Sequence, residues 1–585
     1  MRTHTCGELR VANAGEKVCL CGWVESTRDL GGVIFIIIRD LYGSTQVIFD
    51  TSDSQEAWDL AQSIHNEYVV CAKGVVSARP PDMINPDMLT GAIEVRSNHV
   101  ELLNRCGRMP IPLDEETSRR TADDLKLEFR YLDLRRPAMQ KRLRLRHKIT
   151  QGIRNYLSAE NFTEIETPIL SKSTPEGARD FVVPSRITPG SFYALPQAPQ
   201  QYKQLLMVAG VDRYFQIARC FRDEDLRADR QPEFSQVDME LSFIEQEDIY
   251  NVIDGLLSET MKLSGHGEIE LPIPRMSYDE AMARFGRDAP DIRFGMELVD
   301  LSGVFAQTEF KVFASVIAAG GVVKAINAKT LAGISAKVID EWTDIAKEGG
   351  LGGLATIRVR ESGEWKSPIT KFFSDQEKEL LVEKLEIENG DMILFAADKP
   401  AKVSAVLGRL RLLAGIKAEV IPEGEFAFTW VTNFPMFERN EEGRLQSMHH
   451  PFTAPNDEDI NRLEDMPESV YSKSYDIVLN GVELGGGSIR IHDSRMQMRI
   501  FNILGMQEAE AEERFGHLLR ALGYGAPPHG GIALGLDRLV MMMAGAESLR
   551  DVIAFPKTYT GFDLMMDAPA KIDDRQLEDV HIKLC

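Results

Sequence analysis

The stretch FRDEDLRADRQPEFSQVDMELSF, residues 221–243, constrains the fold more than any other part of the chain. It predicts a β-strand, a charged loop and a second strand. Side chains alternate between the two faces of a strand, so one face of the second strand is apolar and the other carries Gln236, Asp238, Glu240 and Ser242. The preceding run YFQIARCFR brings Arg222 to the loop. A hairpin with this polar floor suits a highly charged ligand, although composition alone would favour a solvated hairpin with a charged tip.

Length and patterning describe a large chain without a membrane span. At 585 residues the chain is too long for one core and predicts three or four domains. No apolar run approaches the roughly 18 residues of a membrane helix, and the run MRTHTCGELR lacks the apolar region of a secretory signal. The seven cysteines are scattered, and no second pair or histidine cluster joins Cys19 and Cys21 to complete a zinc site. We therefore expect reduced thiols, a cytoplasmic location and no membrane partner.

The net charge of −23 limits how the chain can bind nucleic acid. Neutralising phosphates requires Lys and Arg, so indiscriminate binding is not expected. A specific partner requires the basic residues to gather on one surface, and the basic run at 127–148 is a candidate. A solvated helix face is the alternative for that run.

Changes in sequence pattern divide the chain into segments. Residues 1–107 hold five strand-like runs and one helical insert, which predicts a small OB-type β-barrel. A polar hinge, 108–140, follows. The ordered polar signals occupy 141–287 and 421–556, whereas 288–420 are rich in Ala and Gly and mix strand-like with helix-like runs. We therefore expect an α+β insertion within one domain, and a C-terminal extension at 557–585.

A second charged hairpin is predicted in YDIVLNGVELGGGSIRIHD, residues 475–493. Its Asn-Gly pair is a strong two-residue turn. In that register Val478 faces Glu483, and Asp476 shares the face of Glu483 at roughly 7–8 Å, close enough for both carboxylates to hold one cation. Mg²⁺ bound through carboxylates and substrate phosphates is the usual arrangement, and two surface acids are the alternative. Arg490 enters the same region after three glycines.

A third signal lies in GGIALGLDRLVMMMAG, residues 530–545. It predicts a Gly-rich strand that runs into a helix near Asp537. Arg538 falls in the first helical turn, where backbone amides attract phosphate. The string GLDRL is weak alone and gains weight as the third of three ordered signals.

Together these strings resemble the class II aminoacyl-tRNA synthetases, in the form of the bacterial aspartyl-tRNA synthetases. Residues 221–243 resemble motif 2, residues 530–545 resemble motif 3, and FTEIETPIL with Pro168 resembles motif 1, the dimer-interface strand. The resemblance covers essentially the whole chain. It implies a multi-domain homodimer with an OB-type β-barrel for the anticodon, a class II α+β catalytic domain on an antiparallel sheet, and an α+β insertion domain.

The resemblance also assigns roles to matching positions. Arg222, at the α-phosphate, and Arg538, at the γ-phosphate, are the implied catalytic residues. The implied aspartate-binding residues are Glu176, Gln200, Lys203, Arg222, Gln236, Asp238, His449 and Arg490. Those for ATP are Arg222, Asp223, Glu224, Gln231, Glu483, Gly535, Leu536, Asp537 and Arg538, and the implied Mg²⁺ ligands are Asp476 and Glu483. Lys203 and Arg490 would face the substrate's side-chain carboxylate, a pairing that suits an anion.

In the barrel, five residues match family positions that read the anticodon: Arg28, Leu30, Phe35, Gln46 and Glu94. An aromatic platform with polar groups for base edges is the usual way to read unstacked RNA bases. Considered alone, Phe35 would be expected in the core. In many relatives that also charge tRNA-Asn, a histidine stands where Leu30 stands here.

The resemblance implies that the chain activates L-aspartate with ATP to aspartyl-adenylate and transfers it to the 3′ terminal adenosine of tRNA-Asp. A relaxed enzyme that also charges tRNA-Asn is the first alternative. The same fold acting on asparagine or lysine is another, and Lys203 with Arg490 argues against lysine. A non-catalytic RNA-binding paralogue is the last, which the complete set of implied ATP and Mg²⁺ residues disfavours.

Overall fold

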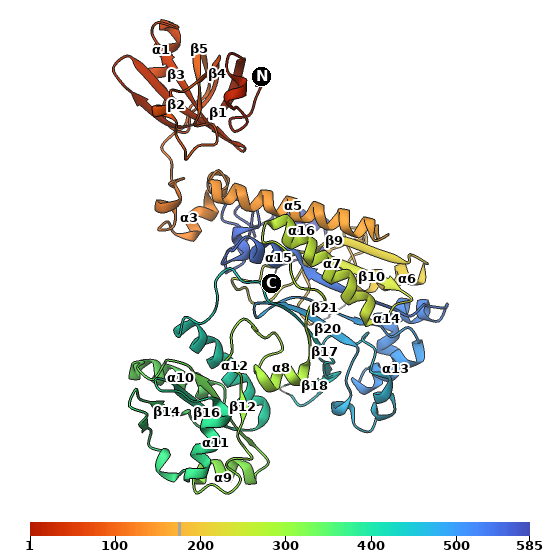
Figure 1. Cartoon of the computed structure of the whole chain (residues 1–585). Coiled ribbons are helices and arrows are strands. Elements are labelled where there is room, and N and C mark those ends of the chain that lie inside the picture. The colour runs from red at the N-terminus through yellow and green to blue at the C-terminus, as the bar shows by residue number, and fades with distance from the viewer. Residues whose placement is uncertain (174–176, 441, 585) are drawn as a thin grey trace. The chain divides into compact units, whose positions relative to one another are not determined.

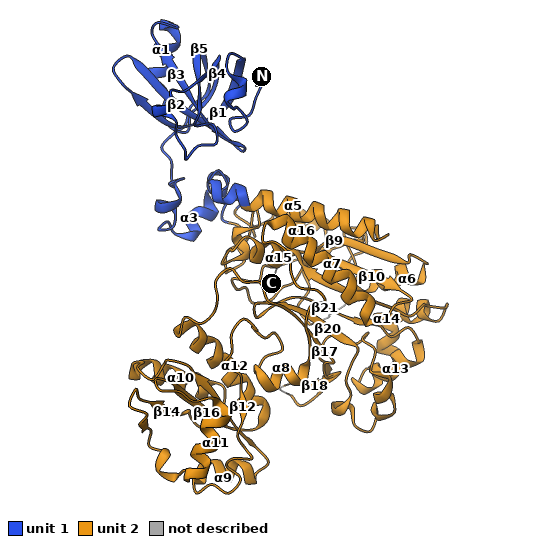
Figure 2. Ribbon diagram, viewed as in Figure 1, with its two compact units in different colours: residues 1–141, 564–566 blue, residues 142–563, 567–585 orange. Residues whose placement is uncertain are grey.

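The computed structural model describes residues 1–173, 177–440 and 442–584, which form two compact units (Figures 1 and 2). The first comprises residues 1–141 with 564–566, and the second comprises 142–563 with 567–585. None of the helices in the described ranges combines the length and apolar character needed to cross a membrane.

The first unit contains a closed five-stranded β-barrel, as the sequence predicts. Its strands follow the order β1-β2-β3-β5-β4 and are β1 (Lys17–Asp29), β2 (Val33–Asp40), β3 (Gly43–Asp50), β4 (Val69–Ala78) and β5 (Ile93–Asn104). Helix α1 (Gln55–Gln62) joins β3 to β4, and the Ser54 side chain caps its first turn. On β2, Ile34, Ile36 and Ile38 fill the barrel, so the residues between them face outward.

The expected hinge contains short helices that its polar composition did not predict. They are α2 (Glu115–Ser118), α3 (Asp123–Glu128) and α4 (Arg130–Asp133). The buried carboxylate of Asp133 accepts hydrogen bonds from Arg130 and Arg136, both at 2.7 Å. Charge-assisted hydrogen bonds of this kind hold the short helices in place.

The second unit is built on an eight-stranded sheet with the order β11-β17-β20-β21-β22-β10-β9-β6. The strands are β6 (Thr163–Glu164), β9 (Arg213–Phe221), β10 (Glu233–Ser242), β11 (Arg275–Ser277), β17 (Phe428–Thr432), β20 (Ser474–Leu479), β21 (Val482–Ile489) and β22 (His529–Gly535). Neighbours are antiparallel except at the two edges, where β11 pairs with β17 and β6 with β9 in parallel. An antiparallel sheet was predicted, and this pattern agrees with it.

Helices cover one face of this sheet and leave the other for polar groups. The long helices α5 (Pro137–Ala159) and α7 (Gln246–Ser264) run along the sheet (Figure 1). Their apolar residues share a core with Val237, Met239 and Leu241 of β10. The alternate residues of β10, including Asp238 and Glu240, therefore face away from these helices, as their spacing predicts.

The expected insertion leaves and re-enters the sheet at neighbouring strands. β11 ends at Ser277 and its parallel partner β17 begins at Phe428. The intervening chain contains α8 (Tyr278–Arg284) and a separate antiparallel sheet, β12 (Val299–Asp300), β13 (Val322–Ala328), β16 (Met392–Asp398), β14 (Ala355–Val359) and β15 (Trp365–Lys366), in that order. Helices α10 (Ala336–Glu348) and α12 (Pro400–Lys417) share one core with this sheet, and α9 (Lys311–Ala318) and α11 (Asp375–Leu385) share another.

The remaining elements are short or lie beside the large sheet. They are β7 (Val182–Pro184), β8 (Phe192–Ala194), α6 (Gln200–Val208), β18 (Phe437–Arg439), β19 (Leu445–Ser447), α13 (Ser494–Ile503), α14 (Glu508–Leu522), α15 (Leu536–Met543) and α16 (Asp574–Asp579). The run FTEIETPIL, expected to be the motif 1 strand, forms only the two-residue β6. The Ile165 N–H still donates to the Phe215 oxygen of β9 at 3.1 Å. Pro168 has no N–H to donate, which suits its place beyond this last strand of the sheet order.

Candidate active site

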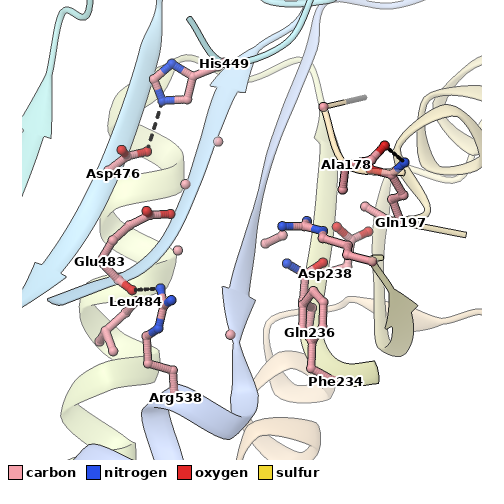
Figure 3. A pocket seen from close by; sticks show the side chains of 18 of the residues that line it. Ala178, Gln197, Phe234, Gln236, Asp238, His449, Asp476, Glu483, Leu484 and Arg538 are labelled. Carbon is pink, nitrogen blue, oxygen red and sulfur yellow. Dashed lines mark hydrogen bonds and ion pairs between the residues drawn. The ribbon is translucent and has the colours of Figure 1, made fainter. Parts of the chain in front are cut away.

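A polar cavity of about 580 Å³ opens on the face of the large sheet that α5 and α7 leave free (Figure 3). Its walls come from β10, β20, β21 and β22, from α6 and the start of α15, and from the loop at 448–450. The predicted site residues that line it are Gln200, Lys203, Arg222, Glu224, Gln231, Gln236, Asp238, His449, Asp476, Glu483, Arg490, Gly535, Asp537 and Arg538. The fold thus brings residues from both parts of the interrupted domain into one cavity.

Two predicted residues stand apart from this lining, and a third, Glu176, lies outside the described residues. Leu536 is buried in the hydrophobic core below the sheet, because it belongs to the apolar face of α15. Asp223 points elsewhere, with its carboxylate 3.5 Å from the Arg179 guanidinium. A side-chain contact with a ligand in the cavity is therefore not expected for Leu536.

The floor of the cavity is a buried chain of alternating charges. Lys203 Nζ lies 2.7 Å from Asp238 Oδ1 and 3.3 Å from Glu240 Oε2. Arg490 grips Glu240 with two nitrogens, Nε at 2.9 Å and Nη2 at 3.2 Å. Burial opposes charge on both acids, but Arg490 and Lys203 lower the pKa of Glu240 overall, whereas burial outweighs Lys203 and raises the pKa of Asp238.

The third nitrogen of Arg490 is held as well. Its Nη1 donates to His450 Nε2 at 2.6 Å and to Ser488 Oγ at 2.7 Å. Burial and the nearby guanidinium lower the pKa of His450 well below its usual value, so this imidazole is neutral and can accept the hydrogen bond. Protein groups alone therefore fix the position of the Arg490 guanidinium.

Several buried polar atoms of the cavity find no hydrogen-bond partner among the described residues. They are the acceptor Asp238 Oδ2, the donor Arg222 Nε, and His449 Nδ1. The Arg222 guanidinium lies 5.1 Å from the centre of the Phe234 ring, which orients it. Buried polar groups are normally paired. These open atoms therefore indicate a ligand that offers both a donor and an acceptor.

The second hairpin places two carboxylates on one wall. Asn480 and Gly481 adopt the left-handed conformation of a two-residue turn, with φ of 52° and 80°. Val478 pairs with Glu483 as predicted, and a one-residue bulge follows, so that Asp476 pairs with Gly486. Figure 3 shows Asp476 and Glu483 on the wall opposite Gln236 and Asp238.

The two carboxylates repel one another. The charge of Asp476, followed by burial, raises the pKa of Glu483 to about 7. His449 Nε2 lies 3.2 Å from Asp476 Oδ1, and this pairing outweighs burial and raises the pKa of His449. Paired oxygen ligands with a surplus of negative charge fit a hard divalent cation.

Arg538 stands at the start of α15 next to this pair. It donates to the Glu483 backbone oxygen, and its Nη2 lies 3.2 Å from Asp229 Oδ2. Asp537 lines the cavity, but its carboxylate is engaged, because Oδ1 pairs with Arg146 and Oδ2 accepts from the Ser235 N–H at 2.6 Å. Asp537 therefore anchors the start of the helix, which holds Arg538 at the cavity.

The predicted anticodon residues lie on neighbouring strands of the barrel. Arg28 is the cross-strand partner of Phe35, and Gln46 Nε2 donates to Glu94 Oε2 at 3.2 Å. Phe35 is half-buried on the outer face rather than in the core, because the core positions of β2 are its neighbours. Leu30 is 69% exposed in the turn between β1 and β2. The barrel thus presents one aromatic ring with polar groups beside it.

The cavity lining also includes ionisable residues that the motifs did not assign: Asp229, Arg230, Asp288 and His450. Glu240, paired with Arg490, belongs to its floor. Most had a signal in the sequence. Asp229 and Arg230 lie in the charged loop of residues 221–243, Glu240 shares the polar face of β10 with Asp238, and His450 adjoins His449. Asp288, at the start of the inserted segment, had none.

Comparisons with known proteins agree with this architecture. Residues 122–559 match the model of the tRNA synthetases class II (D, K and N), and residues 18–103 match that of the OB-fold nucleic acid binding domain. The chain resembles a solved asparaginyl-tRNA synthetase from Pyrococcus horikoshii with a TM-score of 0.59, covering 95% of this chain and 98% of that one at 19% identity. At that identity the likeness supports the fold alone.

Relatives with known names are much closer in sequence. The chain is 50% identical over 583 residues to an aspartate–tRNA(Asp/Asn) ligase of Syntrophotalea carbinolica, covering 100% of this chain and 98% of the relative. It is 52% identical over 583 residues to an aspartate–tRNA ligase of Geobacillus kaustophilus, covering 99% and 98%. The match over three motifs, a charged cavity and a barrel leads to one conclusion: the chain belongs to the class II tRNA synthetases of the D, K and N group and, within them, to the aspartate–tRNA ligase family.

Proposed function

We propose that this protein activates L-aspartate with ATP and transfers the aspartyl group to the 3′ terminal adenosine of tRNA-Asp. The observation that carries the proposal is the buried floor of the cavity, where Lys203 and Arg490 alternate with two acids and Asp238 Oδ2 is open. An amino acid with a charged ammonium and an anionic side chain offers partners to both kinds of group. This floor argues against lysine, whose cationic side chain would meet two fixed cations.

In the proposed aspartate site, the cations and the acids of the cavity floor have different roles. Lys203 and Arg490 bind the side-chain carboxylate, and Asp238 with Glu176 receives the α-ammonium group. Gln200 and Gln236 complete the pocket with neutral donors and acceptors. His449, from the loop at 448–450, borders the aspartate site. A charged ligand held between fixed, desolvated partners gains orientation as well as affinity.

The ATP site occupies the wall formed by the two hairpins and α15. Arg222 holds the α-phosphate and the reacting carboxylate, Glu224 and Gln231 contact the nucleotide with Asp223 nearby, and the turn from Gly535 to Arg538 binds the remaining phosphates. Asp476 and Glu483 fit Mg²⁺, because their carboxylates repel one another and a shared divalent cation would compensate both negative charges. When bound, Mg²⁺ supplies charge neutralisation for the phosphates.

The chemistry needs no nucleophilic side chain. The aspartate carboxylate attacks the α-phosphorus, its new bond replaces the bond to pyrophosphate, and a ribose hydroxyl of the tRNA then displaces AMP from the adenylate. Arg222 neutralises charge at the α-phosphate and Arg538 at the leaving phosphates. Catalysis by this chain is therefore positioning plus electrostatic stabilisation.

For tRNA recognition we propose that Phe35 stacks on an anticodon base while Arg28, Gln46 and Glu94 bind base edges, with Leu30 beside them. A relaxed enzyme that also charges tRNA-Asn is the second candidate. The name of the Syntrophotalea relative, which includes both tRNAs, favours it. We also propose a homodimer with a cytoplasmic location.

Amino-acid-dependent ATP–pyrophosphate exchange, measured without tRNA, tests the first step. We expect exchange with aspartate and far less with asparagine or lysine. Arg222→Ala should abolish it with the fold intact, whereas Arg219→Ala should retain it, because Arg219 pairs with Glu233 outside the cavity. Exchange with asparagine or lysine instead would reassign the substrate, and no exchange with any of them would favour an RNA-binding paralogue.

A further inference from the structure

Three cysteines from two strands meet on the outer face of the barrel. Cys19 and Cys21 alternate along β1, and Cys71 on β4 is the cross-strand partner of Cys21. All three Sγ atoms lie within 4.8 Å of one another, and those of Cys19 and Cys71 are 3.2 Å apart. The sequence alone shows only the first two as a pair, because Cys71 joins them through strand pairing, 52 positions beyond Cys19.

The cluster is shielded but can be reached from solvent. Cys19 is 6% and Cys71 2% exposed, whereas Cys21 is half-buried. The N-terminal segment runs beside the cluster, since the Thr3 N–H donates to the Cys19 oxygen at 2.9 Å and the Cys19 N–H donates to Thr3 Oγ1 at 2.8 Å. An ion entering past Cys21 would be largely removed from water.

The environment of these thiols does not suit a reactive nucleophile. Burial is the first cause that raises the pKa of Cys19, Cys21 and Cys71. Peroxide sensors and nucleophilic cysteines need a lowered pKa, so that the thiolate is present at neutral pH. Lys73 lies opposite Cys19 on the neighbouring strand, and its positive charge acts to lower the Cys19 pKa. The same charge would help to balance thiolates formed by metal binding.

We propose that Cys19, Cys21 and Cys71 form a three-coordinate site for a thiophilic cation, with Cu(I) as the ion that fits best. Thiolate ligands select Cu(I), zinc and iron–sulfur clusters among biological metals. Structural zinc sites are closed by four protein ligands, and no fourth Cys, His, Asp or Glu joins this group in the described part of the chain. Three sulfur ligands are sufficient for Cu(I).

Binding at this site is a ligand exchange without redox chemistry. Each thiol that becomes a ligand releases its proton to solvent and forms one sulfur–copper bond, and neither sulfur nor copper changes oxidation state. The ion would link β1 to β4. Because it binds the folded barrel and not a separated pair of strands, it should also stabilise the barrel by mass action.

The test uses the reduced full-length protein under anaerobic conditions. Cu(I) is titrated in competition with a chromogenic Cu(I) chelator, and X-ray absorption counts the sulfur ligands. We expect one tightly held Cu(I) per chain with three sulfur ligands. Cys21→Ser and Cys71→Ser should each weaken Cu(I) binding by at least about tenfold, because even the loss of an outer-shell partner typically costs that much. Cys106→Ser is the matched control, because Cys106 lies in the same unit and its Sγ contacts Met109 instead.

Several outcomes would overturn the assignment. Equal Cu(I) affinity in the wild type and both ligand variants would place binding elsewhere, and so would equal losses in the Cys106→Ser control. A zinc ion bound more tightly than Cu(I) with four ligands, or a Cys19–Cys71 disulfide as the only product, would also contradict it. Should Cys71→Ser fail to fold, Cys21→Ser decides the matter, because this half-buried change disturbs the barrel least.

Discussion

The four buried charges on the cavity floor stabilise one another as a set. Asp238, Lys203, Glu240 and Arg490 alternate in sign, so removing one member leaves its neighbour buried without compensation. Breaking a buried pair typically costs more than the pair contributes. We expect substitutions here to affect folding as well as aspartate binding, and the two effects must be measured separately.

Two substitutions of Arg490 can separate the effect on folding from the effect on aspartate binding. Arg490→Leu should lower the free energy of unfolding by about 3–5 kcal/mol, because Glu240 then keeps only Lys203. Arg490→Lys keeps a cation but loses the two-nitrogen grip. In Arg490→Lys we expect the KM for aspartate to rise at least about tenfold, with the KM for ATP nearly unchanged, in line with losses of roughly 2–5 kcal/mol for buried charge pairs.

Denaturant unfolding and exchange kinetics check these expectations side by side. Equal increases in both KM values would contradict the role of Arg490 at the aspartate side chain. An Arg490→Leu protein as stable as the wild type would contradict the buried-pair argument.

For single residues, the sequence could predict the face of a strand on which a side chain lies but not its contacts. The alternation of polar and apolar residues along β10 is enough to predict that Asp238 lies on the polar face. The Glu240–Arg490 pair was not predictable, because Glu240 lies on β10, Arg490 follows β21, and β22 stands between those strands in the sheet. Local periodicity carries no information on such cross-sheet neighbours.

At the scale of single elements, the β20–β21 hairpin shows how closely the carboxylate wall is packed. A Cβ on Gly486 would meet Asp476 Oδ1, which is a side-chain atom. A Cβ on Gly487 would meet the Gly531 backbone oxygen and, at 2.8 Å, the Ile532 Cα. The Asp476 side chain can rotate away from a new Cβ, whereas the backbone of Gly531 and Ile532 cannot.

Two alanine substitutions should therefore have different effects. Gly486→Ala should displace the Asp476 carboxylate and reduce aspartate-dependent exchange, with Tm nearly unchanged. Gly487→Ala should push β21 away from β22 and lower the stability by roughly 1–3 kcal/mol or more, the usual cost of overpacking. Thermal melts with exchange assays distinguish them, and a Gly486→Ala protein that loses Tm but retains activity would refute the argument.

Elements were predictable where a local signal existed. The Asn-Gly turn set the register of the β20–β21 hairpin, although the bulge beyond Val478 left no mark in the sequence. The motif 1 run is strand-like in composition, yet its strand β6 covers only Thr163 and Glu164. Whether a run pairs over its full length depends on a neighbouring strand, and the composition of the run does not show where that strand ends.

At the scale of the whole molecule, the change in sequence pattern predicted an inserted segment, and the pairing of β11 with β17 explains how it is accommodated. The three-cysteine cluster was missed, because it depends on the register of the closed barrel.

Apolar side chains in the segment that follows β6 bear on assembly. Ile169 is 40% and Leu170 52% exposed, directly after Pro168 and a few residues beyond the edge strand β6. Neighbouring exposed apolar side chains of this kind favour an interface. We expect a homodimer with a sedimentation mass near twice 65.6 kDa, since isologous pairing is the usual arrangement for identical chains.

A double substitution, Ile169→Asp with Leu170→Asp, should shift this dimer towards single chains. Leu89→Asp is the matched control, because Leu89 is 76% exposed on the other unit. A wild-type mass near one chain at micromolar concentration would contradict the dimer.

We expect the choice between tRNA-Asp and tRNA-Asn to be made at the barrel, because the two anticodons differ at one base. Leu30 is 69% exposed in the turn that follows Arg28, where many relaxed members of the family carry histidine. Histidine can donate or accept a hydrogen bond and so tolerate either base, whereas leucine leaves a polar base edge unsatisfied. We expect the wild type to prefer tRNA-Asp and Leu30→His to raise kcat/KM for tRNA-Asn, while Leu89→His, exposed on the same unit, changes neither. Charging both transcripts side by side decides the matter, and comparable wild-type kcat/KM values would show that Leu30 does not discriminate.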